Sequence, residues 1–237
     1  MYKDIHNQKQ FKWGIFMEDL GFKDRHKRTF DNIPTEKRNR ILKCATNEFA
    51  LNGYENANVS EIAKAAQISV GSIYKYFESK QDLFLTVVHH GIERIDNVLR
   101  SLLAEDVDVL IKVERIIREL QDFSRTQSKL IKLYNEITGE NDDTLARQLA
   151  EAMEGVSASV YKEAIEQGKK TGEIRPDLDT GMAAFMIDNL FMTLQFSYSC
   201  EYYSERFKIF TDENIFENDD FVVEQMLKFI KSAFKYK

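Results

Sequence analysis

The segment Val70–Phe77 carries residues whose chemistry suits contact with a nucleic acid. As a helix, this segment places Ile73 and Phe77 one turn apart, on a face that packs in a small core. Gly71 is small, so the N-terminus of the helix can approach a phosphate group or the edge of a base closely. Four residues with a hydroxyl group or a cation are predicted on the outer face: Ser72, Tyr74, Lys75 and Tyr76. The pattern predicts a helix that contacts DNA.

A second group of residues, in the C-terminal two thirds of the chain, could line a pocket for a small molecule. Methionine and aromatic side chains form adaptable apolar surface, and a few polar groups would orient a ligand. The candidate apolar residues are Met153, Tyr161, Phe185, Met192 and Phe196. The candidate polar anchors are Asn135, Glu136, Asp188 and Asn189. A stripe of methionine and aromatic residues is equally typical of a helical core, so both interpretations stay open.

Asp188 is the most informative of these residues because it interrupts an otherwise apolar helix. A buried carboxylate must be paired or neutralised. Three interpretations follow: a salt bridge, simple exposure to solvent, or a pocket in which the carboxylate receives a cationic ligand.

Metal or haem binding is the alternative from a different class of protein. His89 and Glu93 are four residues apart, as are His90 and Arg94, and helical bundles hold metals with such spacing. A two-residue match is weak, and no second Glu-x-x-His element accompanies it. We therefore predict no cofactor and no metal, with a sensor using His89 or His90 as the alternative. No nucleophile–base arrangement and no phosphate-binding loop is visible, so the protein is predicted not to be an enzyme.

The composition favours long helices. Only two prolines and ten glycines occur in 237 residues, which leaves little material for the turns of an all-β or doubly wound fold. Hydrophobic residues make up 43% and charged residues 30%, and no run reaches the roughly 20 apolar residues of a membrane-spanning helix. Cys44 and Cys200 lie far apart, and no signal pattern opens the chain. We expect a reduced, cytoplasmic protein with no membrane partner.

The charge is distributed unevenly along the chain. The net charge is −6, but residues 1–85 carry 14 Lys and Arg against 11 Asp and Glu. A basic N-terminal third joined to an acidic remainder suits a chain whose two ends meet different partners. The cluster around Trp13 and the basic stretch Lys23–Arg28 are interpreted either as a partly ordered arm or as a basic arm that reaches DNA.

The elements that position residues 70–77 are predicted to form a helix-turn-helix behind a supporting helix. The supporting helix opens at Pro34–Thr35, and Asn52–Gly53 provides a left-handed C-terminal stop. The predicted N-caps of the next three helices are Asn58, with Glu61 as its capping-box partner, Ser69 and Ser79. The fourth helix is expected to run for many turns, past Leu99.

The rest of the chain is predicted to be helical to its end. The expected helices cover residues 111–123, 130–137, 144–167, 180–203 and a last stretch around 222–233. Residues 138–143 and 211–220 are expected to be loops. The helix Thr180–Tyr203 is apolar on two stripes and must be covered from two sides. The rest of the monomer would cover one stripe, and a second subunit could cover the other. The alternative is that both stripes are buried within a monomer.

The stretch Ile41–Leu85 resembles the tetracycline-repressor (TetR) family of bacterial regulators. The resemblance covers about a fifth of the chain and depends on core positions, caps, glycines and a Tyr-x-Tyr-Phe pattern that agree in register. The matching residues are Ala45, Phe49–Ala50, Asn52–Tyr54, Val59–Ala66, Ile68–Phe77 and Ser79–Leu83. Two residues depart from the family pattern. Gln67 stands where the inter-helix turn usually has glycine, and Ala57 stands where threonine is common.

The resemblance implies an all-α fold with an N-terminal three-helix helix-turn-helix head and a C-terminal helical-bundle body for ligand binding and dimerisation. The implied boundaries are an N-terminal extension at 1–33, the DNA-binding domain at 34–80 and the body at 81–237. The DNA-binding residues that it implies are Arg38, Arg40, Asn58, Ser69, Val70, Gly71, Ser72, Tyr74, Lys75, Tyr76 and Lys80.

The expected function is that of a ligand-responsive transcriptional regulator. Repression is the usual mode in the family, so we expect a homodimer that binds a palindromic double-stranded DNA operator and is released by a lipophilic small-molecule effector. The last two predicted helices, Thr180–Tyr203 and the C-terminal one, are expected to form the dimer interface. A tilt of the fourth helix is expected to transmit ligand binding to the head.

Overall fold

The computed structural model describes residues 25–139 and 143–235, and these residues form helices with no β-strand. This confirms the predicted all-α fold. In chain order the elements are α2 (Arg28–Asp31), α3 (Thr35–Asn56), α4 (Val59–Ala65), α5 (Val70–Tyr76), α6 (Lys80–Leu103), α7 (Val109–Thr126), α8 (Ser128–Ile137), α9 (Asp143–Thr171), α10 (Thr180–Ser199), α11 (Glu201–Phe210), the 3-10 turn η1 (Ile215–Glu217) and α12 (Asp219–Phe234).

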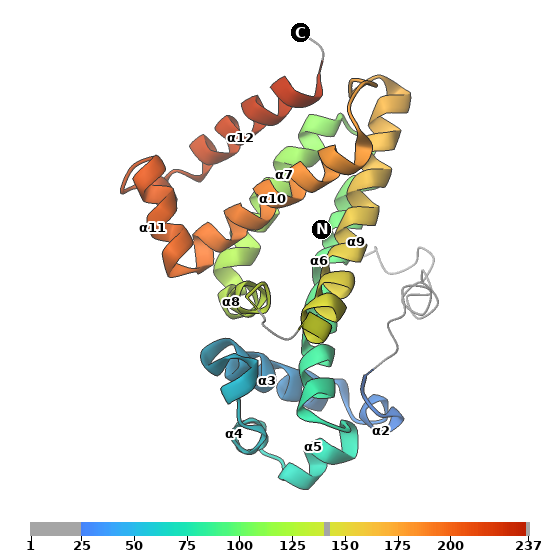
Figure 1. Ribbon diagram of the computed structural model, residues 1–237, viewed down its shortest axis with the longest axis vertical. Coiled ribbons are helices and arrows are strands. Elements are labelled where there is room, and N and C mark those ends of the chain that lie inside the picture. Colours follow the sequence, from blue (N-terminus) through green and yellow to red (C-terminus); the bar gives the residue numbers. More distant parts are fainter. Residues whose placement is uncertain (1–24, 140–142, 236–237) are drawn as a thin grey trace, which may run out of the picture.

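Helices α2 to α5 form a head at one end of the molecule, and α6 extends from this head into the body (Figure 1). The three predicted N-caps are confirmed. The side chains of Asn58, Ser69 and Ser79 each accept a backbone N–H from the first turn of α4, α5 and α6. These bonds satisfy donors that a helix N-terminus would otherwise leave unpaired, so short helices such as α4 and α5 have defined starts.

Of two further predictions for the head, one is confirmed in part and one is wrong. Gly53 has the predicted left-handed backbone (φ 70°) and interrupts the helix, but a further helical turn follows it up to Asn56. The predicted capping box is incomplete. The backbone N–H of Asn58 donates to Oε1 of Glu48 at 3.0 Å, and this carboxylate takes the place predicted for Glu61.

The turn between α4 and α5 contains Gln67 in a left-handed conformation (φ 56°). A side chain other than glycine in this region costs on the order of 1 kcal/mol. Hydrogen bonds on both sides hold the turn: Ile68 N donates to Ala63 O at 3.0 Å, and Arg40 Nε donates to Ala66 O at 3.0 Å. The turn therefore keeps its shape without the glycine that is usual in the family pattern.

The body packs α7, α9, α10 and α12 around a second apolar core, with α6 along one side (Figure 1). The start of α12 is attached to α7 by an ion pair in which Arg125 Nη2 donates to Asp219 Oδ1 at 2.7 Å. This bond holds the pKa of Asp219 below its usual range.

The predicted helix Thr180–Tyr203 is too long by one turn. It ends at Ser199, and Cys200 adopts an extended backbone (φ −114°, ψ 128°) before α11 begins. The segment 197–202 contains no glycine or proline, so nothing local marks the break. The predicted loop 211–220 contains η1 and the first two residues of α12.

Candidate functional site

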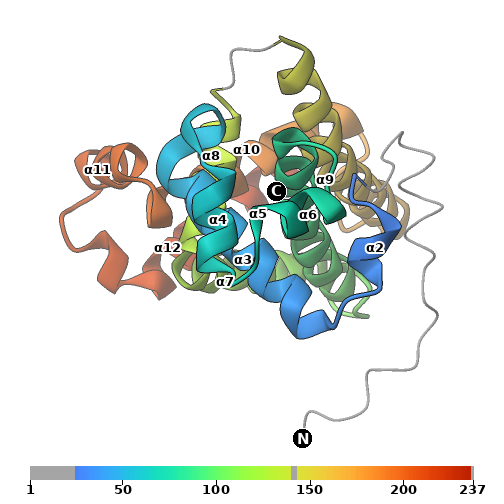
Figure 2. The same ribbon diagram turned by 90° about the horizontal axis from the view of Figure 1, so that it is seen from below.

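Helix α5 lies at the far end of the head from the body, and Figure 2 views the molecule from this side. Its buried face is formed by Ile73 and by Tyr76 at the end of the helix. Ser69 and Ser72 hydrogen-bond to each other at the N-terminus through their hydroxyl groups, 2.9 Å apart. The predicted contact residues that remain accessible on this segment are Ser69, Val70, Gly71, Ser72, Tyr74 and Lys75. The geometry leaves one continuous side of α5 open for a flat or grooved partner.

Tyr76 is not on the outer face, so that part of the prediction is wrong. Only 5% of its surface is exposed, and its ring packs against Phe30 at a centroid distance of 5.6 Å. Its hydroxyl group accepts a hydrogen bond from Lys37 Nζ at 3.1 Å. Helix α2 packs on the end of α5 and covers this side chain. The sequence pattern of α5 alone does not show that another helix packs there.

The remaining head residues of the prediction lie around α5. Arg38 and Asn58 lie at the N-terminal turns of α3 and α4, whereas Arg40 caps the carbonyl end of α4. Lys80 donates to Glu55 O at 2.9 Å and lies 4.8 Å from the ring centroid of Tyr54. An ammonium group has three donors and a guanidinium group five, so both cations keep donors for a phosphate group.

Residues 26–30 attach to the C-terminus of α5, a contact that the sequence analysis missed. Lys27 Nζ donates to Tyr74 O at 2.9 Å, and Thr29 Oγ1 donates to Lys75 O at 2.7 Å. These bonds satisfy carbonyl groups at the end of α5, and a cation there is favoured by the helix dipole. Phe30 is buried in the core of the head. Residues 1–24, which include Trp13 and the first two residues of the basic stretch, Lys23 and Asp24, lie outside the described residues.

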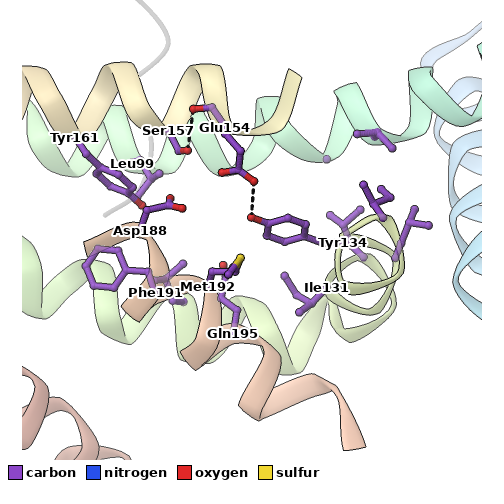
Figure 3. Close-up of a pocket in the computed structure, with 16 residues that line it drawn as sticks. Leu99, Ile131, Tyr134, Glu154, Ser157, Tyr161, Asp188, Phe191, Met192 and Gln195 are labelled. Carbon is purple, nitrogen blue, oxygen red and sulfur yellow. Dashed lines mark hydrogen bonds between the residues drawn. The ribbon is translucent and has the colours of Figure 1, made fainter. Parts of the chain in front are cut away.

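The body contains a mainly apolar cavity of about 80 Å³ between α6, α7, α8, α9 and α10 (Figure 3). Tyr134 Oη donates to Glu154 Oε1 at 3.0 Å across this cavity. Asp188 on α10 points into the same space as Glu154 on α9 (Figure 3). Gln195 also lines the cavity, and its Nε2 atom has no hydrogen-bond partner among the described residues.

The two carboxyl groups of the cavity are shifted toward their neutral forms. Burial, together with the nearby Glu154 carboxylate, raises the pKa of Asp188 to about 6. Burial raises the pKa of Glu154 too, partly opposed by the hydrogen bonds from Tyr134 and Ser157. Burial and the same carboxylates raise the pKa of Tyr134 and Tyr161. The cavity therefore disfavours a negatively charged group and favours a positively charged one.

The structure brings together three of the predicted ligand residues and separates the others. Tyr161, Asp188 and Met192 line the cavity. Phe185 points to the outside with 63% of its surface exposed, and Phe196 is buried beside the cavity, where its ring packs on Tyr134 at 5.1 Å.

The other polar candidates do not line this cavity. Asn189 donates to Phe185 O on its own helix, and the carbonyl group of Asn135 accepts from Thr138. Glu136 lies beside a different hollow, next to the kink of α3. Met153 belongs to α9, but its side chain lies outside the described part of the chain.

Four residues that line the cavity with polar groups were not predicted as ligand residues: Tyr134, Glu154, Ser157 and Gln195. A signal existed for part of this set: Glu154, Ser157 and Tyr161 recur at helical spacing and share one face of α9. Tyr134 and Gln195 belong to other helices, and no spacing links them to α9.

Helix α8 connects the cavity with the head. Leu133 and Ile137 line the cavity and at the same time belong to the apolar core of the head. Gly91 on α6 allows the close approach of α8, because a Cβ atom at this position would lie 2.9 Å from Leu130 Cδ1. A change in the cavity that moved α8 would therefore also move residues of the core of the head.

An apolar surface remains on the outside of the body. It comprises exposed side chains of α10 and α12, defined here as the α10–α12 face: Met182, Phe185, Met186, Phe221 and Phe229. Exposed apolar side chains that gather in one patch are typical of an interface. Helix α11 exposes further apolar side chains next to α10: Tyr202, Ile209 and Phe210.

The described residues contain no group of three or more His, Cys, Asp or Glu side chains that could hold a metal ion. His90 instead faces Glu93, with 3.9 Å between Nδ1 and Oε2. The metal- or haem-binding alternative thus gains no support from this part of the chain. Within residues 25–139 and 143–235, none of the helices combines the length and apolar character needed to cross a bilayer.

Comparison with known proteins places these features in a family context. Residues 41–87 match the family model described as bacterial regulatory proteins, tetR family. The chain is 32% identical over 152 residues to the HTH-type transcriptional regulator YdgC of Bacillus subtilis, an alignment that covers 61% of this chain and 71% of the relative.

Among the solved structures with this fold, two regulators cover about four fifths of this chain. The fatty acid degradation regulator FadR of Bacillus halodurans superimposes with a TM-score of 0.66 at 24% identity, covering 80% of this chain and 97% of that one. The regulator FadR of Bacillus subtilis, solved in complex with stearoyl-CoA, gives a TM-score of 0.65 at 21% identity, covering 79% and 96%.

Proposed function

Because this chain belongs to the tetR family of bacterial regulatory proteins and is a helix-turn-helix transcriptional regulator, we propose that it represses transcription as a homodimer on a palindromic operator. We further propose that a lipophilic small molecule binds the cavity of the body and releases the operator. Its place of action would be the cytoplasm, where the DNA lies.

The accessible side of α5 supports the DNA-binding part of the proposal. Lys75 and Tyr74 project from the helix, and the small residues at its N-terminus permit close contact with base edges in the major groove. Lys80, Arg38 and Arg40 lie around α5 and would neutralise phosphate groups, so operator affinity should fall steeply with salt.

The α10–α12 face supports the dimer. Two copies of this face would bury the exposed phenylalanine and methionine side chains against each other, as in a four-helix interface. A two-fold axis through this interface would present two heads to two half-sites, about 34 Å or a multiple of that distance apart.

The observation that carries the ligand-response proposal is the double role of Leu133 and Ile137. Both side chains contribute to the cavity wall and to the core of the head. A ligand that enlarges the cavity by displacing α8 or α6 would also shift α3, because both helices pack on it. A displacement of a few ångström between the two heads would break the register with the half-sites.

Relatives support a lipophilic effector. The B. subtilis FadR structure contains stearoyl-CoA, and the fatty acid metabolism regulator protein of B. subtilis is 24% identical to this chain over 148 residues. The mainly apolar lining of the cavity is compatible with a ligand that has a large apolar part.

The test begins with selection of the DNA fragments that the purified protein binds in the source genome. We expect an inverted repeat, and release of the protein from it by a lipid extract of the source organism. Met192→Trp should fill the cavity and abolish release, with dimerisation and DNA affinity unchanged. Bound fragments without an inverted repeat would contradict the palindromic operator. Dissociation of the Met192→Trp dimer would assign Met192 to the interface or the core.

A further inference from the structure

The lining of the cavity is mainly apolar but includes acidic groups. Two carboxyl groups, those of Glu154 and Asp188, enter it from facing helices (Figure 3). No Lys or Arg side chain is among the described residues that line it. Both residues are half-buried, and partial burial of a carboxylate with no cation beside it is unfavourable, so a purely apolar ligand would leave this cost uncompensated.

A third polar group faces the same space without a partner. Gln195 is 94% buried (6% of its surface exposed), and its Nε2 atom finds no acceptor among the described residues. Buried polar groups are nearly always hydrogen-bonded in proteins, so an unpaired amide at a cavity wall indicates a polar group or water that occupies the cavity. Nε2 is a donor, so Gln195 points, independently of the carboxyl pair, to a hydrogen-bond acceptor in the cavity, such as a water molecule or an oxygen atom of the ligand beside its cationic group.

Aromatic rings complete the surroundings of the carboxyl groups. Tyr134 and Tyr161 line the cavity beside Glu154 and Asp188, and Phe191 packs on Tyr161 at a centroid distance of 5.9 Å. Ring faces attract cations, and the attraction is largest where water is excluded. Carboxylates and aromatic faces together form the surroundings in which proteins bind organic ammonium groups.

A second cavity of about 50 Å³ lies behind this aromatic pair. Tyr161 and Phe191 line both cavities, so the pair separates them. Apart from Lys112, the described residues that line the second cavity are apolar or aromatic. A rotation of one ring would join the two spaces into a site with a polar, acidic end and an apolar end.

From this arrangement we infer that the effector is an amphiphilic organic cation, with an amine or ammonium group held between Glu154 and Asp188 and an apolar chain directed toward the second cavity. The inference rests on the proposed ligand-responsive function and specifies its ligand class. The same carboxyl groups would repel a fatty acid carboxylate or the phosphates of an acyl-CoA. The ligand class of this chain would then differ from that of the stearoyl-CoA complex of its structural neighbour.

The test compares three probes that share one alkyl chain and differ only in the head group: decylamine, decanol and decanoate. Binding to the purified full-length protein is measured by isothermal titration calorimetry at neutral pH, below micelle formation. We expect decylamine to bind at least tenfold more tightly than decanol and decanoate. A double variant, Glu154→Gln with Asp188→Asn, should lose at least tenfold in affinity for decylamine and change little for decanol.

Two variants keep the comparison interpretable. Glu151→Gln removes an exposed carboxylate from the same helix α9 and should leave decylamine binding unchanged. If the double variant fails to fold, Asp188→Asn alone and the ranking of the three probes on the unaltered protein decide the matter. The inference is overturned if decylamine does not bind, if decanoate binds as tightly, or if loss of the carboxyl groups leaves the affinity for decylamine unchanged.

The selected operator fragments separate this inference from the proposed function. If a neutral or anionic molecule releases the protein from its operator and decylamine does not bind, the ligand class is wrong and the regulator stands. If decylamine binds through the two carboxyl groups and no operator fragment is ever bound or released, the site stands and the regulatory proposal fails.

Discussion

Tyr134 on α8 and Glu154 on α9 are joined by a hydrogen bond of 3.0 Å across the cavity of the body. The bond links α8, which contacts the head, to α9, which carries one of the two carboxyl groups of the cavity. Its acceptor is the half-buried carboxylate of Glu154, and hydrogen bonds to charged groups contribute more to stability than neutral ones, about 1.5–3 kcal/mol.

Tyr134→Phe should therefore lower the free energy of unfolding by roughly 1–2 kcal/mol, because it leaves the Glu154 carboxyl group without this donor. Urea denaturation followed by circular dichroism measures the change. Tyr202→Phe, at an exposed position on α11, is the control and should have no effect. In a Glu154→Gln background the cost of Tyr134→Phe should shrink. Equal costs in both backgrounds would mean that the bond does not stabilise the protein.

Asp188→Asn should stabilise the protein at neutral pH. The pKa of Asp188 is about 6 in the folded protein, above the ordinary 3.8. The folded state thus holds this proton more tightly, and its contribution to stability is present at low pH and lost as the pH rises from about 4 through about 6. The variant should be more stable by on the order of 1–2 kcal/mol near pH 7.5, with part of the shift discounted for solvent access.

Thermal unfolding across this pH range checks the prediction for Asp188→Asn. The variant should show a flatter dependence between about pH 4 and 7 than the unaltered protein. Glu151→Gln serves as the matched removal of an exposed carboxylate. A variant that is less stable than the unaltered protein at neutral pH would show that a partner compensates the Asp188 charge.

Lys75→Ala should reduce discrimination between sequences. If Lys75 contacts a base, the loss should be roughly 1–3 kcal/mol on the selected operator and much less on random DNA. Fluorescence anisotropy with both duplexes gives the two affinities. Lys228→Ala removes an equally exposed cation from α12, outside the head, and should change neither. Equal losses on operator and random DNA would place Lys75 on a phosphate group.

Lys80→Ala should weaken binding to all sequences about equally and lower the slope of log affinity against log salt by about one, because one phosphate contact is lost. The titration is done at several salt concentrations. Lys80 also bonds Glu55 O and lies on the Tyr54 ring, so the head should lose about 1 kcal/mol of stability. A melting curve of the variant separates this loss from the electrostatic effect, and an unchanged salt slope would contradict the phosphate contact.

Phe229→Glu should dissociate the dimer at micromolar concentration. Phe229 is 64% exposed on the α10–α12 face, and burial of the new carboxylates against each other would be strongly unfavourable. Sedimentation velocity measures the assembly. Leu51→Glu, an equally exposed apolar position on α3 of the head, should leave the dimer intact. A dimeric Phe229→Glu variant would place the interface elsewhere.

Much of the head could be predicted because its signals are local. The caps Asn58, Ser69 and Ser79 each bond a backbone group two or three residues away, and Gly53 takes its left-handed conformation within a single turn. Such contacts depend on neighbouring residues alone, so spacing in the sequence was sufficient for them. The exposure of Tyr76 was predicted wrongly because the packing of α2 on α5 was not predicted. That packing depends on contacts between residues 46 positions apart in the sequence, such as Thr29 and Lys75.

The sequence by itself determined the helical class and the head, which follow from composition, periodicity and local caps, and it indicated the family through the resemblance of residues 41–85. Only the tertiary structure decided the cavity. Glu154, Tyr134 and Asp188 come from three helices, and which of their faces meet depends on the packing of the whole body. Periodicity tells which face of a helix is apolar, but it carries no information on the crossing angle or on the helix that covers that face. For this reason Phe185 and Phe196 shared a predicted pocket, whereas the fold placed one outside and the other behind the cavity wall.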